Sequence, residues 1–171
     1  MNKNVKNMLF VFGGYWVITE LVEYNERWDM YNRSREYCDS VQKPLLRVGI
    51  RRGPFEPPNG DVTIDISDEI LDVPGGIVGD ERDMPFADKE FGVCFNEHTI
   101  EHIDDPTTIG AAISECIRVA DYAVIIAPGP YTYGGLFHPD HKVRLWFEDD
   151  HIIVRARPYI KNWTNLSFPG I

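Results

Sequence analysis

The hydrophobic positions of this chain form short apolar runs from residue 45 onward, each bounded by glycine, proline or acidic residues. Runs of this length and flanking composition predict buried β-strands. The run at 122–128 is wholly apolar, as is typical of a central strand in a parallel sheet. The strands expected from this pattern are 45–50, 61–66, 75–80, 91–96 and 122–128.

Helical spacing marks the segments that precede and separate these strands. Residues 20–42 carry aromatic side chains three, four and six positions apart among charges, which predicts an amphipathic helix that ends before Pro44. Residues 106–119 repeat apolar positions at helical spacing. Ser67, followed by acidic residues, predicts the cap of a short helix.

Near the C-terminus two further apolar runs predict a β-hairpin. Residues 142–147 and 151–160 are separated by Glu-Asp-Asp. Strands that alternate with helices and then end in a hairpin predict an α/β fold, with a mostly parallel Rossmann-like sheet and a C-terminal antiparallel hairpin at its edge. Ligands of such sheets bind beyond the carboxyl ends of the strands, so we look for chemistry in the loops that follow them.

The N-terminal segment is strongly apolar and raises a separate question. Residues 8–22 read MLFVFGGYWVITELV and include Glu20. A membrane-spanning helix needs roughly 20 apolar residues, so the pattern favours a helix that packs on the domain, or that lies on a membrane or a partner, over a spanning anchor. We therefore divide the chain into an apolar segment, 1–23, and a domain, 24–171.

Composition narrows the classes of function. The chain has 171 residues, enough for one domain with a substantial core, and a net charge of −10. This charge disfavours nucleic-acid binding, which needs clustered lysine and arginine. Its three cysteines form no CxxC pair, which argues against a zinc knuckle or a redox pair, and their odd number indicates a reducing compartment. We expect a cytoplasmic protein whose only membrane contact would be the segment 8–22.

One short motif suggests a metalloprotease. His98-Thr99-Ile100-Glu101-His102 has the H-x-x-E-H spacing of an inverted zinc protease, with two histidines on one helix face and a glutamate as base. The segment follows a buried strand and runs directly into Asp104-Asp105-Pro106, which leaves little room for a helix. His138 and His141 could add ligands, but two histidines on a loop do not define a site. We expect no metal here.

The wider stretch that contains this motif resembles a large enzyme family. The ordered set GDERDMPFADKEFGVCF, IEHIDDP and ISECIRVADYAVIIAP occupies 79–128. In this order and spacing, residues 45–128 resemble the class I S-adenosylmethionine-dependent methyltransferases of the type 11 group. The resemblance implies the Rossmann-like methyltransferase sheet, S-adenosylmethionine as cofactor and methyl transfer to a small or lipid-like acceptor. Glu101-His102 is then part of the family's common EH signature.

The resemblance also implies a set of cofactor-binding residues. The acid that ends the second strand holds the two ribose hydroxyls of the cofactor in this family, and a carboxylate can accept both hydrogen bonds. Two acids near 80 match the adenine side of the site, and the residues after the fourth strand face the methionine and the substrate. Each position has a structural alternative as a turn, cap or loop residue. The implied cofactor residues are Gly49, Gly53, Asp65, Asp80, Glu81 and Asn96. No catalytic residue is implied.

The first loop departs from the family pattern. The family reads D-x-G-x-G-x-G, whereas this chain has Arg47 in place of the leading acid and Arg51 in place of the middle glycine. Glycines there let the backbone approach the cofactor, and we expect Arg51 to fill the space of the methionine moiety. The following PFEPPNG is too rich in proline for the helix that usually starts there.

Two classes of function therefore stay open. One is a methyltransferase. The other is a catalytically inactive relative, which keeps the fold as a scaffold or interaction module for a protein partner or a membrane through residues 8–22.

Overall fold

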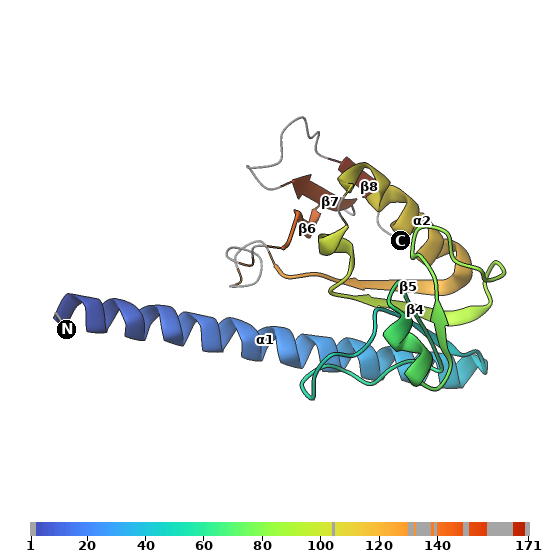
Figure 1. Cartoon of the computed structure of the whole chain (residues 1–171), viewed down its shortest axis with the longest axis horizontal. Helices are drawn as coiled ribbons and strands as arrows, with labels where there is room; N and C mark the ends of the chain where they lie inside the picture. Colours follow the sequence, from blue (N-terminus) through green and yellow to red (C-terminus); the bar gives the residue numbers. More distant parts are fainter. Residues whose placement is uncertain are drawn as a thin grey trace.

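The computed structural model describes residues 3–103, 105–129, 132, 138, 140–148, 151–156 and 166–169. Its centre is a five-stranded sheet in the order β3-β2-β1-β4-β5, with every neighbouring pair parallel (Figure 1). The strands are β1 (Leu45–Val48), β2 (Val62–Asp65), β3 (Gly76–Val78), β4 (Phe91–Glu97) and β5 (Ala120–Ile126). All five were predicted from the apolar runs, and the α/β class is confirmed.

Two long helices cover this sheet. Helix α1 (Lys3–Val41) packs its C-terminal half on β4, β1 and β5, and α2 (Ile109–Val119) packs on β4 and β5. The N-terminal half of α1 projects beyond the sheet (Figure 1). The helix predicted at 20–42 therefore continues without a break into the apolar segment, and the boundary drawn between residues 23 and 24 lies inside it. No helix in the described part of the chain is both long and apolar enough to cross a membrane.

Three short 3-10 helices connect these elements, at Asp68–Asp72 (η1), Ile100–His102 (η2) and Pro106–Thr108 (η3). Ser67 caps η1 as predicted, because its hydroxyl accepts a hydrogen bond from the backbone N–H of Glu69.

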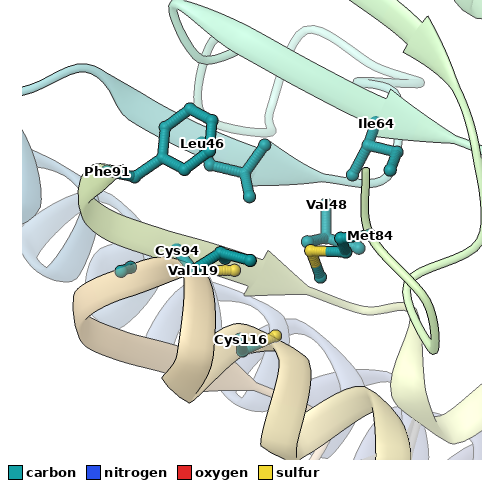
Figure 2. Close-up of a cluster of buried hydrophobic side chains, with 9 residues drawn as sticks. Leu46, Val48, Ile64, Met84, Phe91, Cys94, Cys116 and Val119 are labelled. Atoms are coloured by element: carbon teal, nitrogen blue, oxygen red, sulfur yellow. The ribbon is translucent and has the colours of Figure 1, made fainter. Parts of the chain in front are cut away.

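Alternate residues of the strands point to opposite faces of the sheet and belong to two apolar clusters, one on each face. Figure 2 shows the cluster toward α2, where Leu46 and Cys94 meet Cys116 of the helix. On the other face, Leu45 and Phe95 pack against Tyr31 of α1. Cys94 is fully buried, as expected for a core residue.

The C-terminal strands form a sheet of their own. Strands β6 (Val143–Glu148), β7 (His151–Ala156) and β8 (Leu166–Pro169) pair antiparallel in the order β6-β7-β8. The expectation that this hairpin extends the edge of the parallel sheet is wrong within the described strands. Instead, Val143 and Leu145 pack into a third apolar cluster with Ile100, Ile103 and the start of α2. This packing brings the start of β6 next to the loop that follows β4.

Candidate functional site

A pocket of about 750 Å³ opens beyond the carboxyl ends of β1, β2 and β4. The strand order reverses direction between β1 and β4, so this is the switch point at which ligands of doubly wound sheets bind. The wall comes from the strand ends, from α1 and from the segment after β5. It includes Glu23, Arg27, Arg47, Gly49, Arg52, Asp65, Asp80, Glu81, Glu97, His98, Thr99, His102, His138 and His141.

Asp65 lies at the end of β2, on the pocket wall, as the resemblance implies. One carboxylate oxygen accepts a hydrogen bond from the backbone N–H of Ile50 at 2.8 Å, and the other accepts from the N–H of Ser67 at 2.8 Å. Each oxygen has a second lone pair. The carboxylate is thus fixed in place and can still accept hydrogen bonds from a pair of neighbouring hydroxyls.

Gly49 makes the turn that follows β1. Its φ is +87°, and a Cβ there would lie 2.5 Å from Cγ2 of Thr99. The backbone at this point needs glycine both for its conformation and for its close approach to the loop after β4. Gly53 is different, because its φ is not in the left-handed region and it is not among the described residues of the wall. A role for Gly53 in cofactor binding stays a prediction.

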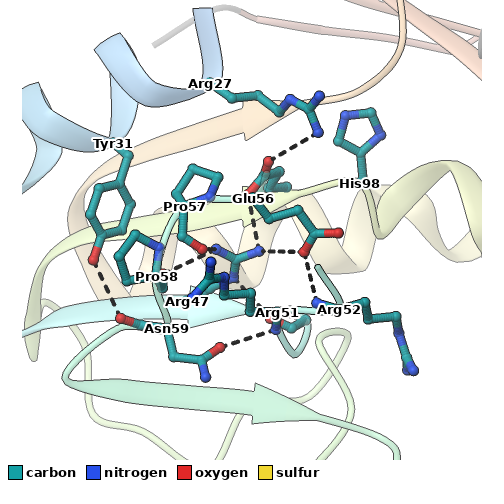
Figure 3. Close-up of polar contacts among 12 residues, drawn as sticks. Arg27, Tyr31, Arg47, Arg51, Arg52, Glu56, Pro57, Pro58, Asn59 and His98 are labelled. Atoms are coloured by element: carbon teal, nitrogen blue, oxygen red, sulfur yellow. Dashed lines mark hydrogen bonds and ion pairs between the residues drawn. The ribbon is translucent and has the colours of Figure 1, made fainter. Parts of the chain in front are cut away.

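Arg47 is the centre of a buried polar network (Figure 3). Its side chain is 2% exposed, and its Nη2 lies 3.0 Å from Oε2 of Glu97, which is 1% exposed. It also donates to the carbonyl oxygens of Gly49, Pro57 and Pro58. Burial lowers the pKa of Arg47, and the charge of Glu97 opposes that effect. Arg47, which replaces the family's leading acid, therefore holds the loop 49–60 in place through hydrogen bonds to its backbone.

The loop 49–60 contains no helix, in agreement with its proline content, and every residue of it is described. Aromatic residues of α1 hold it from outside. Trp28 donates its indole N–H to the carbonyl of Phe55, and Tyr31 donates its hydroxyl to the carbonyl of Asn59.

The expectation that Arg51 fills the pocket is wrong. Its guanidinium turns back onto its own loop and donates to the carbonyl oxygens of Gly53 and Pro54. The side chain is exposed and is absent from the described wall, whereas Arg52 is part of it. The middle position of the glycine motif therefore leaves the pocket open.

Asp80 and Glu81 follow β3 on the adenine side that the resemblance implies, but their environments differ. Arg82 pairs with the Asp80 carboxylate, and this hydrogen bond lowers the pKa of Asp80. Glu81 is half-buried on the pocket wall, and burial raises its pKa despite the hydrogen bonds with Asn96 and Thr99.

The Asn96 side chain hydrogen-bonds to the Glu81 carboxyl group and does not form part of the described pocket wall. Its side chain is fully buried, and its amide donates to Oε2 of Glu81 at 2.6 Å. The Thr99 hydroxyl lies 3.0 Å from the same Glu81 oxygen and 2.5 Å from Oδ1 of Asn96. One hydroxyl proton cannot serve both acceptors, so a protonated Glu81 that donates to Thr99 satisfies the whole group. Asn96 is not part of the described pocket wall, and its contact with the cofactor stays a prediction.

The segment after β4 forms no protease helix. His98 has a φ of +54°, and only Ile100–His102 is helical, as a single 3-10 turn. His98 and His102 therefore do not lie on one α-helical face, as the H-x-x-E-H motif requires. Instead, Nδ1 of His98 lies 3.0 Å from Oε1 of Glu101. Burial lowers the pKa of His98, but the hydrogen bond and the negative charge of Glu101 together outweigh it, and the pKa is raised overall.

Residues 61–124 match the family model described as a methyltransferase domain. The match confirms the predicted resemblance to the class I S-adenosylmethionine-dependent methyltransferases. It begins after the loop that carries Arg47 and Arg51, so the part of the chain that departs from the family pattern lies outside the matched segment.

Among solved structures, the chain is similar to a S-adenosylmethionine-dependent methyltransferase of Thermotoga maritima, described as a possible histamine N-methyltransferase. The two are 14% identical with a TM-score of 0.42, over 91% of this chain and 92% of that one. None of the curated proteins matches the chain.

Some residues of the pocket wall carry no signal in the sequence. Arg27 of α1 reaches to within 3.7 Å of Oε1 of Glu97. Nothing in its helical context distinguishes it from a solvated arginine. His141 and His138 could be noted as a pair on a loop, but their approach to the pocket depends on how β6 packs.

Proposed function

We propose that this methyltransferase-like protein binds S-adenosylmethionine in the pocket at the ends of β1, β2 and β4, and transfers its methyl group to a small or lipid-like acceptor. The observation that supports this most directly is the pairing of Asp65 with the Gly49 turn on one wall. A fixed carboxylate and a backbone without a Cβ, side by side on this wall, support the binding of the cofactor there.

The chemistry of the wall fits the cofactor. Asp65 retains lone pairs for the ribose hydroxyls, and Arg52 and Arg27 offer positive charge for the methionine carboxylate. Glu23 and Glu56 offer negative charge on the same wall. When bound, the cofactor supplies a methyl group activated on a sulfonium. The residues of the chain contribute binding and alignment, because positioning is the main source of rate in such a transfer.

Calorimetric titration of S-adenosylmethionine and S-adenosylhomocysteine into the full chain tests this proposal. The informative variant is Asp65→Asn, and the matched control is Asp68→Asn, which removes an exposed acid of η1 outside the described wall. We expect Asp65→Asn to weaken binding by about tenfold or more, as the loss of charge-assisted hydrogen bonds does, and the control to bind like the wild type. A folded wild-type chain that binds neither compound would overturn the proposal.

The second candidate function is a catalytically inactive scaffold. The observation that favours it is the half of α1 that projects beyond the sheet (Figure 1). Its exposed side chains include Trp16, Val17, Ile18 and Leu21. Such a run of exposed apolar side chains is typical of a surface that contacts a partner or a membrane. Sedimentation of the full chain with lipid vesicles, compared with a variant carrying Trp16→Ser and Ile18→Ser, tests the membrane form. This candidate gains support if the variant stays in solution, the wild type sediments, and the cofactor titration shows no binding.

A further inference from the structure

Four of the five histidines of the chain gather around one buried carboxylate. His98 and His102 come from the loop after β4, and His138 and His141 come from the segment that leads into β6. The ring of His141 lies 4.7 Å from that of His102 and 4.2 Å from that of His138, measured between ring centres. All four line the pocket.

Glu101 is the centre of this group. Its side chain is 1% exposed. Oε1 lies 3.0 Å from Nδ1 of His98 and 4.0 Å from Nε2 of His141. Oε2 is buried and has no hydrogen-bond partner among the described residues. A buried carboxylate oxygen without a partner is costly, and a cation beside it removes that cost.

The histidines offer nitrogen ligands close to the Glu101 carboxylate. A ligand atom of each of Glu101, His102 and His141 lies within 4.8 Å of the other two. His138 stacks on His141 with 17° between the ring planes. Its Nδ1 accepts a hydrogen bond from the backbone N–H of Asp140 at 3.4 Å, so Nε2 carries the proton of the neutral ring. Nε2 becomes a ligand only when that proton moves to Nδ1 and the contact with Asp140 is given up.

We propose that Glu101, His102 and His141 bind a divalent transition-metal ion at the wall of the pocket, with His138 next to them as the nearest further ligand. Imidazole and carboxylate together suit Zn²⁺ and its chemical neighbours, and a carboxylate with two histidines is a common ligand set of catalytic zinc. Ligands of a tetrahedral ion at about 2.0–2.1 Å lie about 3.4 Å apart, so the three atoms must approach by about 1.4 Å at most. His102 is exposed and can supply that movement by a change of rotamer.

The surrounding contacts hold these ligands in the way that metal sites require. His98 holds Oε1 of Glu101, so Oε2 keeps its lone pairs for an ion. The backbone N–H of Lys142 donates to the carbonyl of Glu101 at 2.7 Å and joins the two segments that carry the ligands. Apolar packing of Val143 with Ile100 fixes the same junction.

This arrangement differs from the protease motif in the same stretch. In that motif the two histidines of H-x-x-E-H are ligands and the glutamate is a base. Here Glu101 is itself a ligand, His98 is the residue behind it, and His141 comes from 39 positions further along the chain. Because both ligand histidines, His102 and His141, line the pocket, an open position of the ion would face the molecule bound there.

Metal binding by the tag-free full chain, stripped with a chelator and then titrated with Co²⁺ and Zn²⁺, tests this proposal without reference to methyl transfer. We expect one Co²⁺ per chain, visible-region absorption typical of nitrogen and oxygen ligands, and displacement by Zn²⁺. Sulfur coordination would give a different spectrum, and all three cysteines are buried in the core. Metal binding without cofactor binding would support this inference and overturn the proposed function. Cofactor binding without metal binding would support the proposed function and overturn this inference.

Variants at exposed ligands keep the test independent of folding. His102→Ala and His138→Ala alter exposed side chains. His102→Ala should weaken Co²⁺ binding by at least about tenfold, and adding His138→Ala should weaken it further. His151→Ala, at a histidine of β7 outside the proposed set, is the control and should bind like the wild type. A wild-type chain that takes up no Co²⁺, or equal uptake by the wild type and the double variant, would overturn the proposal.

Discussion

Nη2 of Arg47 lies 3.0 Å from Oε2 of Glu97, and both side chains are almost completely buried. The two residues belong to adjacent strands, β1 and β4, at the edge of the pocket. Burial raises the pKa of Glu97, and the positive charge of Arg47 is the main influence that lowers it. The arginine that stands in place of the family's leading acid is thus balanced by an acid on the neighbouring strand.

A double-mutant cycle on this pair should show strong coupling. We expect Arg47→Met to lower the free energy of unfolding by about 3–5 kcal/mol, because it leaves Glu97 buried without the cation that stabilises its charge most, and Arg27 lies further away, at 3.7 Å. Adding Glu97→Gln to that variant should restore part of the loss. Urea denaturation of the wild type, both single variants and the double variant measures the coupling.

The exposed pair Arg52–Glu69, 3.4 Å apart, is the matched control, with a coupling of about 0–1 kcal/mol expected. Additive effects of Arg47→Met and Glu97→Gln would contradict a role for their charge pair.

Gly49 and Gly53 should respond differently to alanine, although both belong to the glycine motif. Gly49→Ala places a Cβ 2.5 Å from Cγ2 of Thr99 at a φ of +87°, so we expect a loss of about 1–3 kcal/mol in stability. The nearest atom to a Cβ on Gly53 is 4.0 Å away, and Gly53→Ala should be close to neutral. Thermal unfolding measures both changes. Thr99→Ser removes the clashing methyl group and should recover part of the Gly49→Ala loss, and equal effects at the two glycines would contradict this account.

Arg118 fixes the backbone of the stretch after Asp80. Its guanidinium donates to the carbonyl oxygens of Met84 and Phe86 and to both oxygens of Glu115, which in turn accepts from the N–H of Met84. A lysine cannot reproduce this fork. We expect Arg118→Lys to cost about 1–3 kcal/mol of stability, measured by urea denaturation.

Arg33→Lys, in the exposed pair with Asp29, is the control for this change and should cost less than about 0.5 kcal/mol. Equal effects of the two substitutions would show that the contacts of Arg118 with the loop contribute nothing.

The sequence predicts the parallel sheet well because each strand carries its own signal. The apolar runs at 45–50, 91–96 and 122–128 are flanked by turn residues, and their pairing follows from the α/β alternation. The length of α1 could not be predicted in the same way. Two adjacent glycines interrupt its apolar run, and their low helix propensity conceals the continuity of the helix.

The candidate site was predictable where the signal is local and not where it depends on packing. Asp65 could be placed at the pocket because it ends an apolar strand. The direction of the Arg51 side chain could not be predicted, because its guanidinium binds carbonyl oxygens of its own loop and no sequence pattern indicates this. The approach of His141 to Glu101 depends on the packing of β6 against η2, a contact between segments about 40 residues apart that no short pattern encodes.

The pH dependence of stability should carry the signature of Glu81. Burial raises the pKa of this carboxyl above its ordinary value of 4.5, so its contribution to stability is complete below that value and is lost as the pH rises through the raised pKa. Glu81→Gln cannot ionise. Its amide keeps only one of the two contacts of Oε2, because no single amide atom can both accept from Asn96 and donate to Thr99. The variant should therefore become more stable relative to the wild type as the pH rises, with no advantage in acid.

Asp80→Asn is the control. Arg82 lowers the pKa of Asp80 below 3.8, so the effect of this substitution on stability is constant above that pH. Urea denaturation across the acid and neutral range decides the matter, and parallel profiles for Glu81→Gln and the wild type would show that Glu81 is ionised in the folded chain as readily as in the unfolded one.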